Sequence, residues 1–494
     1  MTLSLFRIDP ADSVATALRD LDAGTDIVVG DVGVTLREAI GRGHKVALRS
    51  LHPGDPVLKF GFPIGVATAE IAPGDHVHVH NVSTALAASG AYVWRPHGKS
   101  ADAVVPATGF AGYRRADGRV GTRNEIWIIP TVGCVGRTAQ KIADIAGRRH
   151  AGRVDGVLAL AHPFGCSQLG GDLDGTRSIL AALAAHPNAG GVLLLGLGCE
   201  SNQLDQLLGE IDPALHGKIR NVAAQFAGDE IEEGLALVDA LVEQAATAER
   251  TQVPLSDLVL GVKCGGSDGF SGLTANPLVG RMSDAVTRAG GTAILTEIPE
   301  IFGAEQLLMD RAADEQVFDG IGALVNDFKR YFTDHGQPVS ENPSPGNIAG
   351  GITTLEEKSL GAVQKAGHAI VTDVRRYGER IRRTGLTLLE APGNDAVSST
   401  ALTAAGATII LFTTGRGTPL GFPAPTVKIA SNTPLAERKP NWIDFDAGQV
   451  LDKGMDQAAE ALLDTVRAIA SGRQTASERN GEREIAIWKR GVTL

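Results

Sequence analysis

The sequence predicts an α/β protein in which a small β-rich N-terminal module precedes two α/β domains with mainly parallel sheets. The 494 residues are too many for one hydrophobic core, so about two to four domains are expected. Beyond residue 110, apolar strand-like runs alternate with helical segments, which is the pattern of parallel sheets with helices packed on them. Glycine-containing polar loops follow these runs, and open α/β sheets bind ligands at that edge.

Three units and a linker are expected along the chain. The first unit, residues 1–98, contains short strand-like segments divided by turns, and Ala11–Leu21 is predicted to be its helix. A linker is expected over 99–109, in a stretch rich in small residues and proline. The second unit covers 110–250 and the third covers 251–494. The strands of the first unit are expected at Thr25–Val29, Val34–Leu36, Lys45–Leu48, Val57–Phe60 and His76–His80.

Composition and charge exclude several classes of protein. Apolar residues make up 43% of the chain, and no apolar run reaches the roughly 18 residues that span a bilayer. The N-terminus lacks the basic region and apolar core of a signal peptide, so a cytoplasmic location is expected. The net charge of −11 argues against nucleic acid or an acidic membrane surface as a partner.

The strand-to-loop unit that best indicates a site is Leu258–Pro277, LVLGVKCGGSDGFSGLTANP. Its apolar start is typical of a buried parallel strand. Its loop supplies Ser267, Asp268 and Asn276 as hydrogen-bonding groups and Cys264 as a soft metal ligand. A glycine-rich turn that caps the next helix is the alternative interpretation. Repetition of the pattern along the chain favours a binding site.

Two further loops of the third unit carry polar groups suited to proton transfer or anion binding. Glu297 and Glu300 follow the strand-like run GGTAILT, and Asn347 lies in a Pro/Gly-rich loop that enters a helix, where anions bind well. Thr414 and Arg416 follow the strand ATIILFT. In the second unit, Arg119, Arg123 and Asn124 precede a strand, and bidentate guanidinium groups predict a carboxylate substrate. A basic surface hairpin is the alternative for these arginines.

The first unit carries a group of histidines. His44 and Lys45 lie in GRGHKVAL, and His76, His78 and His80 alternate in GDHVHVHNV. Alternate residues of a strand share a face, and His-x-His is a common metal-ligand spacing. A solvated strand face is the alternative to a metal site.

Four cysteines occur, each beyond a strand-like run: Cys134, Cys166, Cys199 and Cys264. Their spacing matches neither a zinc ribbon nor a thioredoxin motif, and a cytoplasmic chain keeps them reduced. Buried structural cysteines are one interpretation. If all four converge, they are alternative iron ligands, because thiolates hold iron–sulfur clusters.

Several long motifs, all in one order, resemble the altronate/galactarate dehydratase family. They are GHKVAL, KFGFPIG and HVHVHN in the first unit, GYRRADGRVGTRN, HPFGC and GLGCE in the second, and CGGSDGFSGLTANP, EIPEIFGAE, PSPGNIAGGITTLEEKSLG and FTTGRGTPLGFPAPTVK in the third. The resemblance covers nearly the whole chain. It implies that the first unit is a β-clip module of the SAF type.

The resemblance also implies a reaction and a cofactor. Members of this family remove water from a hydroxylated sugar acid to give a 2-keto-3-deoxy acid, and the family is associated with a divalent metal. Fe²⁺ is therefore the expected cofactor, with Mn²⁺ as an alternative. Removing a proton α to a carboxylate creates a dianionic enediolate, which metal or cationic groups must stabilise.

These needs suggest roles for the candidate residues. Lys45 is expected to act as a base or a cation, and as a base it needs burial or a metal to lower its pKa. His44 is assigned to metal binding or catalysis, together with His78 and His80 as metal ligands. Glu297 or Glu300 is expected to bind metal or transfer protons. Substrate binding is assigned to Arg119, Arg123, Asn124, Ser267, Asp268, Asn276, Asn347, Thr414 and Arg416.

D-altronate is the favoured substrate, because galactarate presents a second carboxylate for which no further arginine is evident. Galactarate or another aldonate or aldarate is an alternative, as is sulfite elimination from a sulfolactate-like acid. A carboxylate sensor is the non-enzymatic alternative, but the cost of burying so many polar groups without a reaction argues against it. An iron–sulfur cluster is less favoured than mononuclear iron. A homodimer is expected on general grounds.

Overall fold

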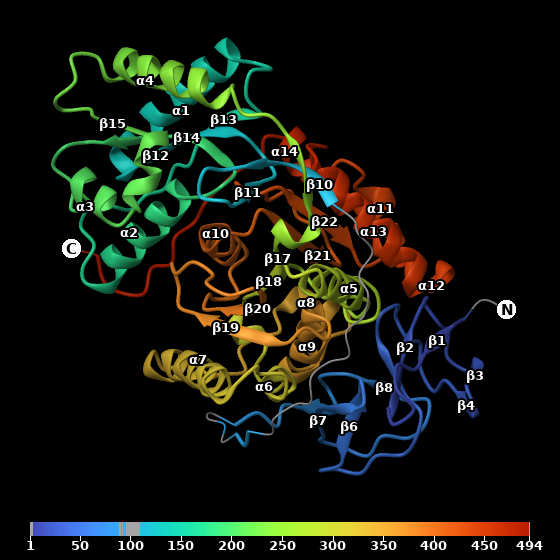
Figure 1. Ribbon diagram of the computed structural model, residues 1–494. Coiled ribbons are helices and arrows are strands. Elements are labelled where there is room, and N and C mark those ends of the chain that lie inside the picture. The colour runs from blue at the N-terminus through green and yellow to red at the C-terminus, as the bar shows by residue number, and fades with distance from the viewer. Residues whose placement is uncertain (1–2, 88–89, 91, 95–108, 494) are drawn as a thin grey trace.

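The computed structural model describes residues 3–87, 90, 92–94 and 109–493, and Figure 1 labels its helices and strands. The fold is α/β, with a small β-rich N-terminal module, as the sequence predicts. The linker expected over 99–109 lies outside the described residues except for Gly109, which begins a strand.

The N-terminal module consists of short antiparallel strands. One sheet has the order β1-β2-β5-β8, a second β6-β7-β9, and β3 pairs with β4. The helix predicted over Ala11–Leu21 is wrong: this segment contains β2, which pairs with β5 and is buried along its whole length, so burial on both faces outweighs helix propensity. The bounds are β1 Leu5–Phe6, β2 Val14–Ala17, β3 Asp26–Val29, β4 Val32–Thr35, β5 Lys45–Ala47, β6 Pro56–Lys59, β7 Phe62–Ala67, β8 His76–Val77 and β9 Val82–Ser83.

The second domain is a parallel sheet, ordered β13-β12-β14-β15, between two layers of helices. Helices α1 and α4 pack on one face through a cluster around Ile142 and Leu241, and α2 and α3 pack on the other around Ile179 and Leu207 (Figure 1). The strands are β12 Glu125–Pro130, β13 Gly156–Ala159, β14 Ala189–Gly196 and β15 Ile219–Ala223, and the helices are α1 Gly136–Arg149, α2 Gly171–Ala184, α3 Leu204–Gly209 and α4 Glu230–Ala245.

The third domain is built on a seven-stranded parallel sheet of order β19-β20-β18-β17-β21-β22-β23. Helices α5, α7 and α13 belong to the largest hydrophobic core, and α10 packs through Leu402 against the core around Phe412. The strands are β17 Val259–Cys264, β18 Thr292–Leu295, β19 Val371–Arg375, β20 Gly385–Leu389, β21 Ile409–Thr414, β22 Thr426–Ala430 and β23 Phe445–Asp446. The helices include α5 Ala275–Arg288, α6 Glu305–Met309, α7 Glu315–Asp334, α8 Pro345–Ala349, α9 Leu355–Ala362, α10 Asp395–Ala405, α11 Thr433–Arg438, α12 Val450–Lys453, α13 Met455–Ala470 and α14 Ala476–Arg479.

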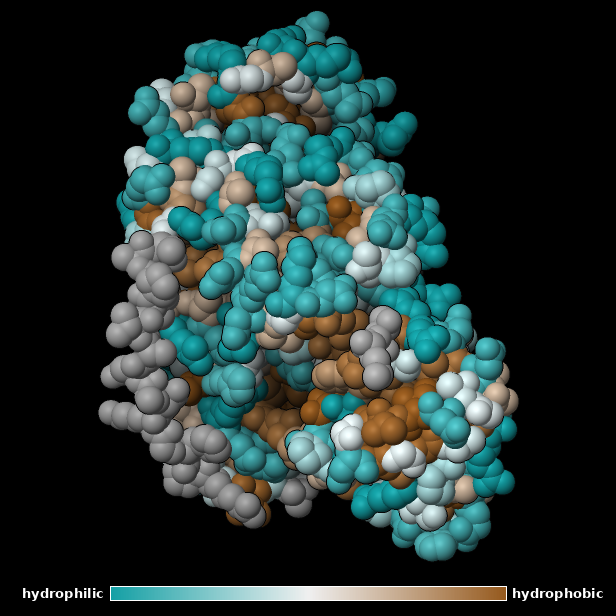
Figure 2. Space-filling view, turned by 90° about the vertical axis from the view of Figure 1, so that its right-hand side faces the viewer, coloured by the Kyte–Doolittle hydropathy of each residue, from teal (hydrophilic) through white to brown (hydrophobic). Residues whose placement is uncertain are grey.

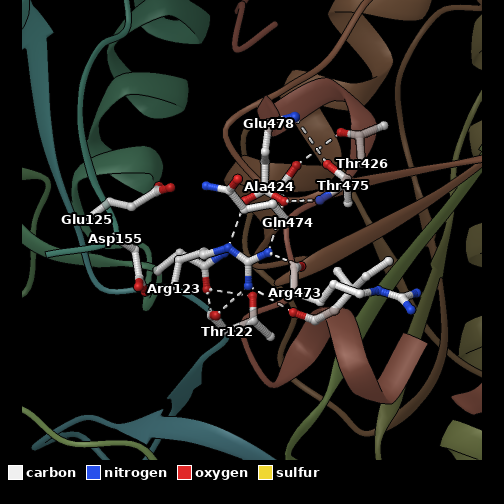
Figure 3. A network of polar contacts seen from close by, with 12 residues as sticks. Thr122, Arg123, Glu125, Asp155, Ala424, Thr426, Arg473, Gln474, Thr475 and Glu478 are labelled. Atoms are coloured by element: carbon white, nitrogen blue, oxygen red, sulfur yellow. Dashed lines mark hydrogen bonds and ion pairs between the residues drawn. The ribbon is translucent and has the colours of Figure 1, made fainter. Parts of the chain in front are cut away.

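A small antiparallel sheet and a buried ion-pair network join the second domain to the third. Strand β10 (Gly109–Arg114) lies between β11 (Val120–Gly121) and β16 (Thr251–Pro254). Beside it, the Arg123 guanidinium binds both carboxylate oxygens of Glu478 at 2.7 and 2.9 Å and donates to the carbonyls of Ile469 and Arg473 (Figure 3). Bidentate geometry and burial make this a strong contact between the domains.

Candidate active site

The N-terminal module packs against the loop that follows β17 in the third domain and against α9 with the residues that precede it. The packing is close: a Cβ atom added to Gly269 would lie 2.0 Å from the carbonyl oxygen of Gly43. In Figure 2 the module is the lower lobe, and hydrophobic residues are visible where it meets the body. A cavity of about 20 Å³ lies at the junction, lined by Lys59, Phe60, Ser267, Asp268, Gly269, Ser271, Gly272, Asn276, Ile352, Glu357, Lys358 and Gly361. This space holds about one water molecule, so a larger ligand requires the surrounding loops to move.

Histidines of the module gather near this junction. His44 precedes β5 and His76 lies in β8, which pairs with β5, so Nδ1 of His44 lies 2.9 Å from Nε2 of His76. His78 follows in a turn, because β8 ends at Val77 and not at the predicted His80. Ligand atoms of His44, His76 and His78 all lie within 4.8 Å of one another. His80 belongs to a second group, with His76 and the exposed Glu38.

The imidazoles of this cluster are held in their neutral form. Burial lowers the pKa of His76 to about 3 and that of His78 to about 4, with further lowering by neighbouring histidines and Lys45. Burial and Lys45 also lower the pKa of His44. Nδ1 of His78 is buried and lacks a hydrogen-bond partner among the described residues. Neutral imidazole is the form that binds metal, so this donor set fits a divalent cation.

Behind the histidines, a buried carboxylate pairs with two lysines across the junction. Lys45 Nζ lies 2.9 Å and Lys59 Nζ 2.8 Å from different oxygens of Glu357, and all three side chains are at most 3% exposed. Lys45 also donates to the Gly351 carbonyl at 2.6 Å. Burial lowers the pKa of Lys45 to about 8. Burial opposes ionisation of Glu357, but Lys45 and Lys59 outweigh it and hold its pKa well below the ordinary value.

A second buried network contains Glu300 and Cys264. Sγ of Cys264 lies 3.1 Å from Glu300 and accepts from Lys365 at 2.9 Å, while Lys358 lies 2.9 Å from Glu300. Burial raises the pKa of Cys264 to about 12, so its thiol stays protonated. Burial opposes ionisation of Glu300, but Lys358 and Lys365 together lower its pKa.

Glu297 adjoins this network in an unusual backbone conformation. Its φ is +65°, in the left-handed region, and one carboxylate oxygen accepts from the Cys264 N–H at 2.9 Å. Lys263 lies 2.9 Å from its other oxygen, yet burial raises its pKa. Cys264, Glu297 and Glu300 lie close enough to form a metal-ligand set, but the ammonium groups of the adjacent lysines already supply the positive charge there.

The structure brings together most of the predicted substrate-binding residues of the third domain. Asn347 donates to the Ser267 carbonyl at 2.8 Å, and Ser267, Asp268 and Asn276 line the cavity. Asp268 is held by the hydroxyls of Ser271 and Ser431, and Asn276 is held by Thr413 and the Gly361 carbonyl. Arg416 donates to the Gly346 carbonyl at 2.9 Å, and Thr414 accepts from the Gly417 N–H.

The predicted residues of the second domain have other contacts. Arg123 joins the domains through Glu478, Arg119 pairs with Asp117, and Asn124 donates to the Ala245 carbonyl. These contacts place Arg123 and Asn124 in the framework of the fold and away from the histidine cluster. Arg123 thus marks a domain contact, whereas Arg119 stays within the second domain, where it also donates to the Ala185 carbonyl. Sequence spacing alone does not distinguish either contact from a carboxylate site.

The four cysteines do not form one site. Cys264 is buried in the third domain, whereas Cys134, Cys166 and Cys199 are exposed in loops of the second domain. A single set of four iron ligands is therefore excluded. Several charged residues near the junction had no predicted role. Most of them lie in the motifs KFGFPIG, KCGG and LEEKSLG, so these motifs could have indicated them. These residues are Lys59, Lys263, Glu357, Lys358 and Lys365. His76, which alternates with His78 and His80, was not assigned as a metal ligand.

Three family models match the chain in the order of its domains. The altronate/galactarate dehydratase SAF domain matches residues 3–85, and the second domain of D-galactarate dehydratase/altronate hydrolase matches residues 112–246. The C-terminal domain of D-galactarate/altronate dehydratase matches residues 255–493. None of the helices in the described residues combines the length and the apolar composition that a membrane span requires.

Three proteins are similar over nearly the full length. The altronate dehydratase of Escherichia coli (strain K12) is 50% identical, with 100% of both chains covered. That of Bacillus subtilis (strain 168) is 48% identical over 99% of this chain and 100% of the relative. The galactarate dehydratase (L-threo-forming) of Escherichia coli (strain K12) is 32% identical over 96% of this chain and 94% of the relative. These similarities define the chain as an enzyme of the hydro-lyase class. It belongs to the altronate/galactarate dehydratase family, as the resemblance predicted.

Proposed function

We propose that this enzyme is a metal-dependent dehydratase that converts an aldonic acid, D-altronate in particular, to a 2-keto-3-deoxy acid. The observation that carries the proposal is the cluster of neutral His44, His76 and His78 beside a junction rich in buried lysines. The identities of 50% and 48% to two altronate dehydratases, against 32% to a galactarate dehydratase, favour D-altronate over galactarate.

The histidines would hold a divalent cation, Fe²⁺ in the first place and Mn²⁺ as an alternative. Among the described residues, the buried Nδ1 of His78 has no hydrogen-bond partner, which supports this assignment because a buried polar atom without a partner is costly unless a ligand satisfies it. When bound, such an ion supplies Lewis-acid polarisation of a carboxylate oxygen.

The chain's own cations supply the charge that the enediolate requires. Lys59 and Lys358 line the cavity, where their ammonium groups stabilise a bound carboxylate and the negative charge that develops on deprotonation. Ser267, Asp268 and Asn276 line the same cavity and orient the hydroxyl groups of the sugar acid. Loop movement is needed for the acid to enter, since the cavity is only about 20 Å³.

Proton transfer is assigned to two groups whose pKa values have shifted. Lys45, with a pKa lowered to about 8, is the proposed base for the C2 proton, because a part of its population is neutral near pH 7. Glu300 lies 2.9 Å from Lys358, and its neighbour Glu297 has a raised pKa. We assign proton delivery to the Lys358 ammonium, which ionised Glu300 orients and which gives its proton to the leaving C3 hydroxyl group, with Glu297 as the acid that restores the proton. The C3 hydroxyl then leaves as water, and the enol product tautomerises to the 2-keto acid.

A substrate screen tests the proposal. Protein loaded anaerobically with Fe²⁺ is incubated with hexonates, pentonates and aldarates, and 2-keto-3-deoxy acid is measured. D-altronate is expected to be turned over fastest. Faster turnover of galactarate would replace the substrate assignment, and sulfite release from sulfolactate would replace the reaction. Binding without turnover across the panel would indicate a sensor. A cytoplasmic location and a homodimer stay predictions.

A further inference from the structure

Three exposed cysteines lie at one edge of the second domain. Strand β12 lies between β13 and β14, and all three strands are parallel, so the loops that follow them are neighbours at the carboxyl edge of the sheet. Cys134 lies in a short 3₁₀ helix (Gly133–Val135) that follows β12, and Cys166 and Cys199 lie in the loops after β13 and β14. The fold therefore brings to one edge three thiols that are 32 or 33 residues apart in sequence.

Backbone contacts tie these loops together. The Gly133 N–H donates to the Phe164 carbonyl at 2.9 Å, so the first loop contacts the second beside Cys134 and Cys166. The Asn202 N–H donates to the Gly165 carbonyl at 2.9 Å, which joins the second loop to the third. A Cβ at Gly165 would lie 2.0 Å from the Thr131 carbonyl oxygen, so only glycine permits this approach.

Polar groups lie beside two of the three sulfurs. Groups of Ser201 and Ser167 lower the pKa of the Cys166 thiol, and Gln225 Nε2 donates to Sγ of Cys199 at 3.3 Å. Hydrogen bonds of this kind stabilise thiolates that ligate metal and tune the metal they hold. All three thiols are exposed, which distinguishes them from the buried, protonated Cys264.

We propose that Cys134, Cys166 and Cys199 hold an iron–sulfur cluster through three thiolates, which leaves one iron without a protein cysteine. Among the described residues, the sets of three donor atoms that lie within 4.8 Å of one another do not include this trio. A single tetrahedral ion such as Zn²⁺ requires its sulfur ligands to lie less than 4.8 Å apart, because each Zn–S bond is only about 2.3 Å long. A cluster spaces its thiolates farther apart, since each one binds a different iron.

This site is separate from the proposed active site. The three cysteines follow strands of the second domain, whereas the proposed active site lies between the N-terminal module and the third domain. None of the three cysteines belongs to the histidine cluster, and a metal cluster bound by them does not depend on the proposed function. A cluster on the three cysteines contains acid-labile sulfide, whereas a mononuclear Fe²⁺ ion on imidazoles contains none. Labile sulfide therefore distinguishes the two iron sites.

Cluster content tests the proposal directly. The full chain is reconstituted anaerobically with iron, sulfide and excess thiol, and freed of unbound material by gel filtration. Iron and acid-labile sulfide are then counted, and the visible absorbance is recorded. We expect about four irons and four sulfides per chain, with a broad band near 400 nm. Cys134→Ser, Cys166→Ser and Cys199→Ser should each lose most of the sulfide and of the band. Circular dichroism checks that these variants fold, which is expected because the substituted positions are exposed.

Cys264→Ser is the matched control and should retain the full sulfide content, because its thiol lies in another domain. Absence of labile sulfide from the wild-type chain would overturn the proposal. Labile sulfide that persists in a folded variant lacking all three exposed cysteines would also overturn it, because the iron and sulfide would then be bound adventitiously. Zinc bound by the trio in place of iron and sulfide would also contradict it.

Discussion

Replacing His76 with alanine is expected to abolish tight binding of Fe²⁺ or Mn²⁺ at the N-terminal module and to lower kcat by about a thousandfold or more. His76 is the member that both histidine groups share, and its Nε2 lies 2.9 Å from Nδ1 of His44. Its loss leaves each group with two donors. Equilibrium dialysis of the metal and turnover of D-altronate measure the two effects. Mn²⁺ is the better probe for binding, because it gives an electron paramagnetic resonance signal when free.

The control for this experiment is His52→Ala in the same module. His52 pairs with Glu70, and both side chains are 70% exposed, so the pair contributes little to stability. This variant should keep metal affinity and turnover. Unchanged metal binding in folded His76→Ala would contradict the assignment of the histidine cluster, whatever the turnover.

Glu357→Gln is expected to destabilise the protein by about 3–5 kcal/mol, because it leaves the buried ammonium groups of Lys45 and Lys59 without a counter-charge. Chemical unfolding at pH 7 measures the loss. Glu356→Gln is the matched control: Glu356 is the preceding residue, is also buried, and accepts from the neutral donors Thr84 and Ala85. It should cost about 1 kcal/mol. Equal losses in the two variants would show that the ion pairs do not hold the module in place.

The same carboxylate predicts a pH dependence. The folded pKa of Glu357 lies below its ordinary value of 4.5, so its contribution is complete above about pH 4.5 and is lost as the pH falls toward the folded value. The wild-type melting temperature should therefore fall steeply below pH 4.5. Glu357→Gln should show a shallower fall in that range.

The sequence predicted the α/β class well because apolar strand runs and helical segments alternate over the last two domains. It failed for Ala11–Leu21, where helical spacing of apolar residues coincides with a buried strand paired to β5. The strand predicted over His76–His80 was too long by three residues, yet the turn after Val77 still brings His78 to His44. Local patterns thus found the histidines, although the backbone places them differently than expected.

The charged pairs could not be predicted from local patterns. Lys45 and Glu357 are 312 residues apart, and their contact exists only because the module packs on the third domain. Arg123 looked like a carboxylate-binding residue, and it does bind a carboxylate, but that carboxylate is Glu478 of the same chain. Sequence spacing predicts the chemistry of a side chain, whereas its partner depends on how the domains pack.

The most direct test of metal-dependent dehydration is a titration of chelator-stripped protein with Fe²⁺ in the absence of sulfide and oxygen. Bound iron and turnover of D-altronate are measured on the same samples, for the wild type and for His76→Ala. We expect the stripped wild type to be inactive and its activity to rise in proportion to one bound ion per chain, with no recovery in His76→Ala. Full turnover by the stripped protein, or recovery that is equal in His76→Ala, would contradict the proposed function.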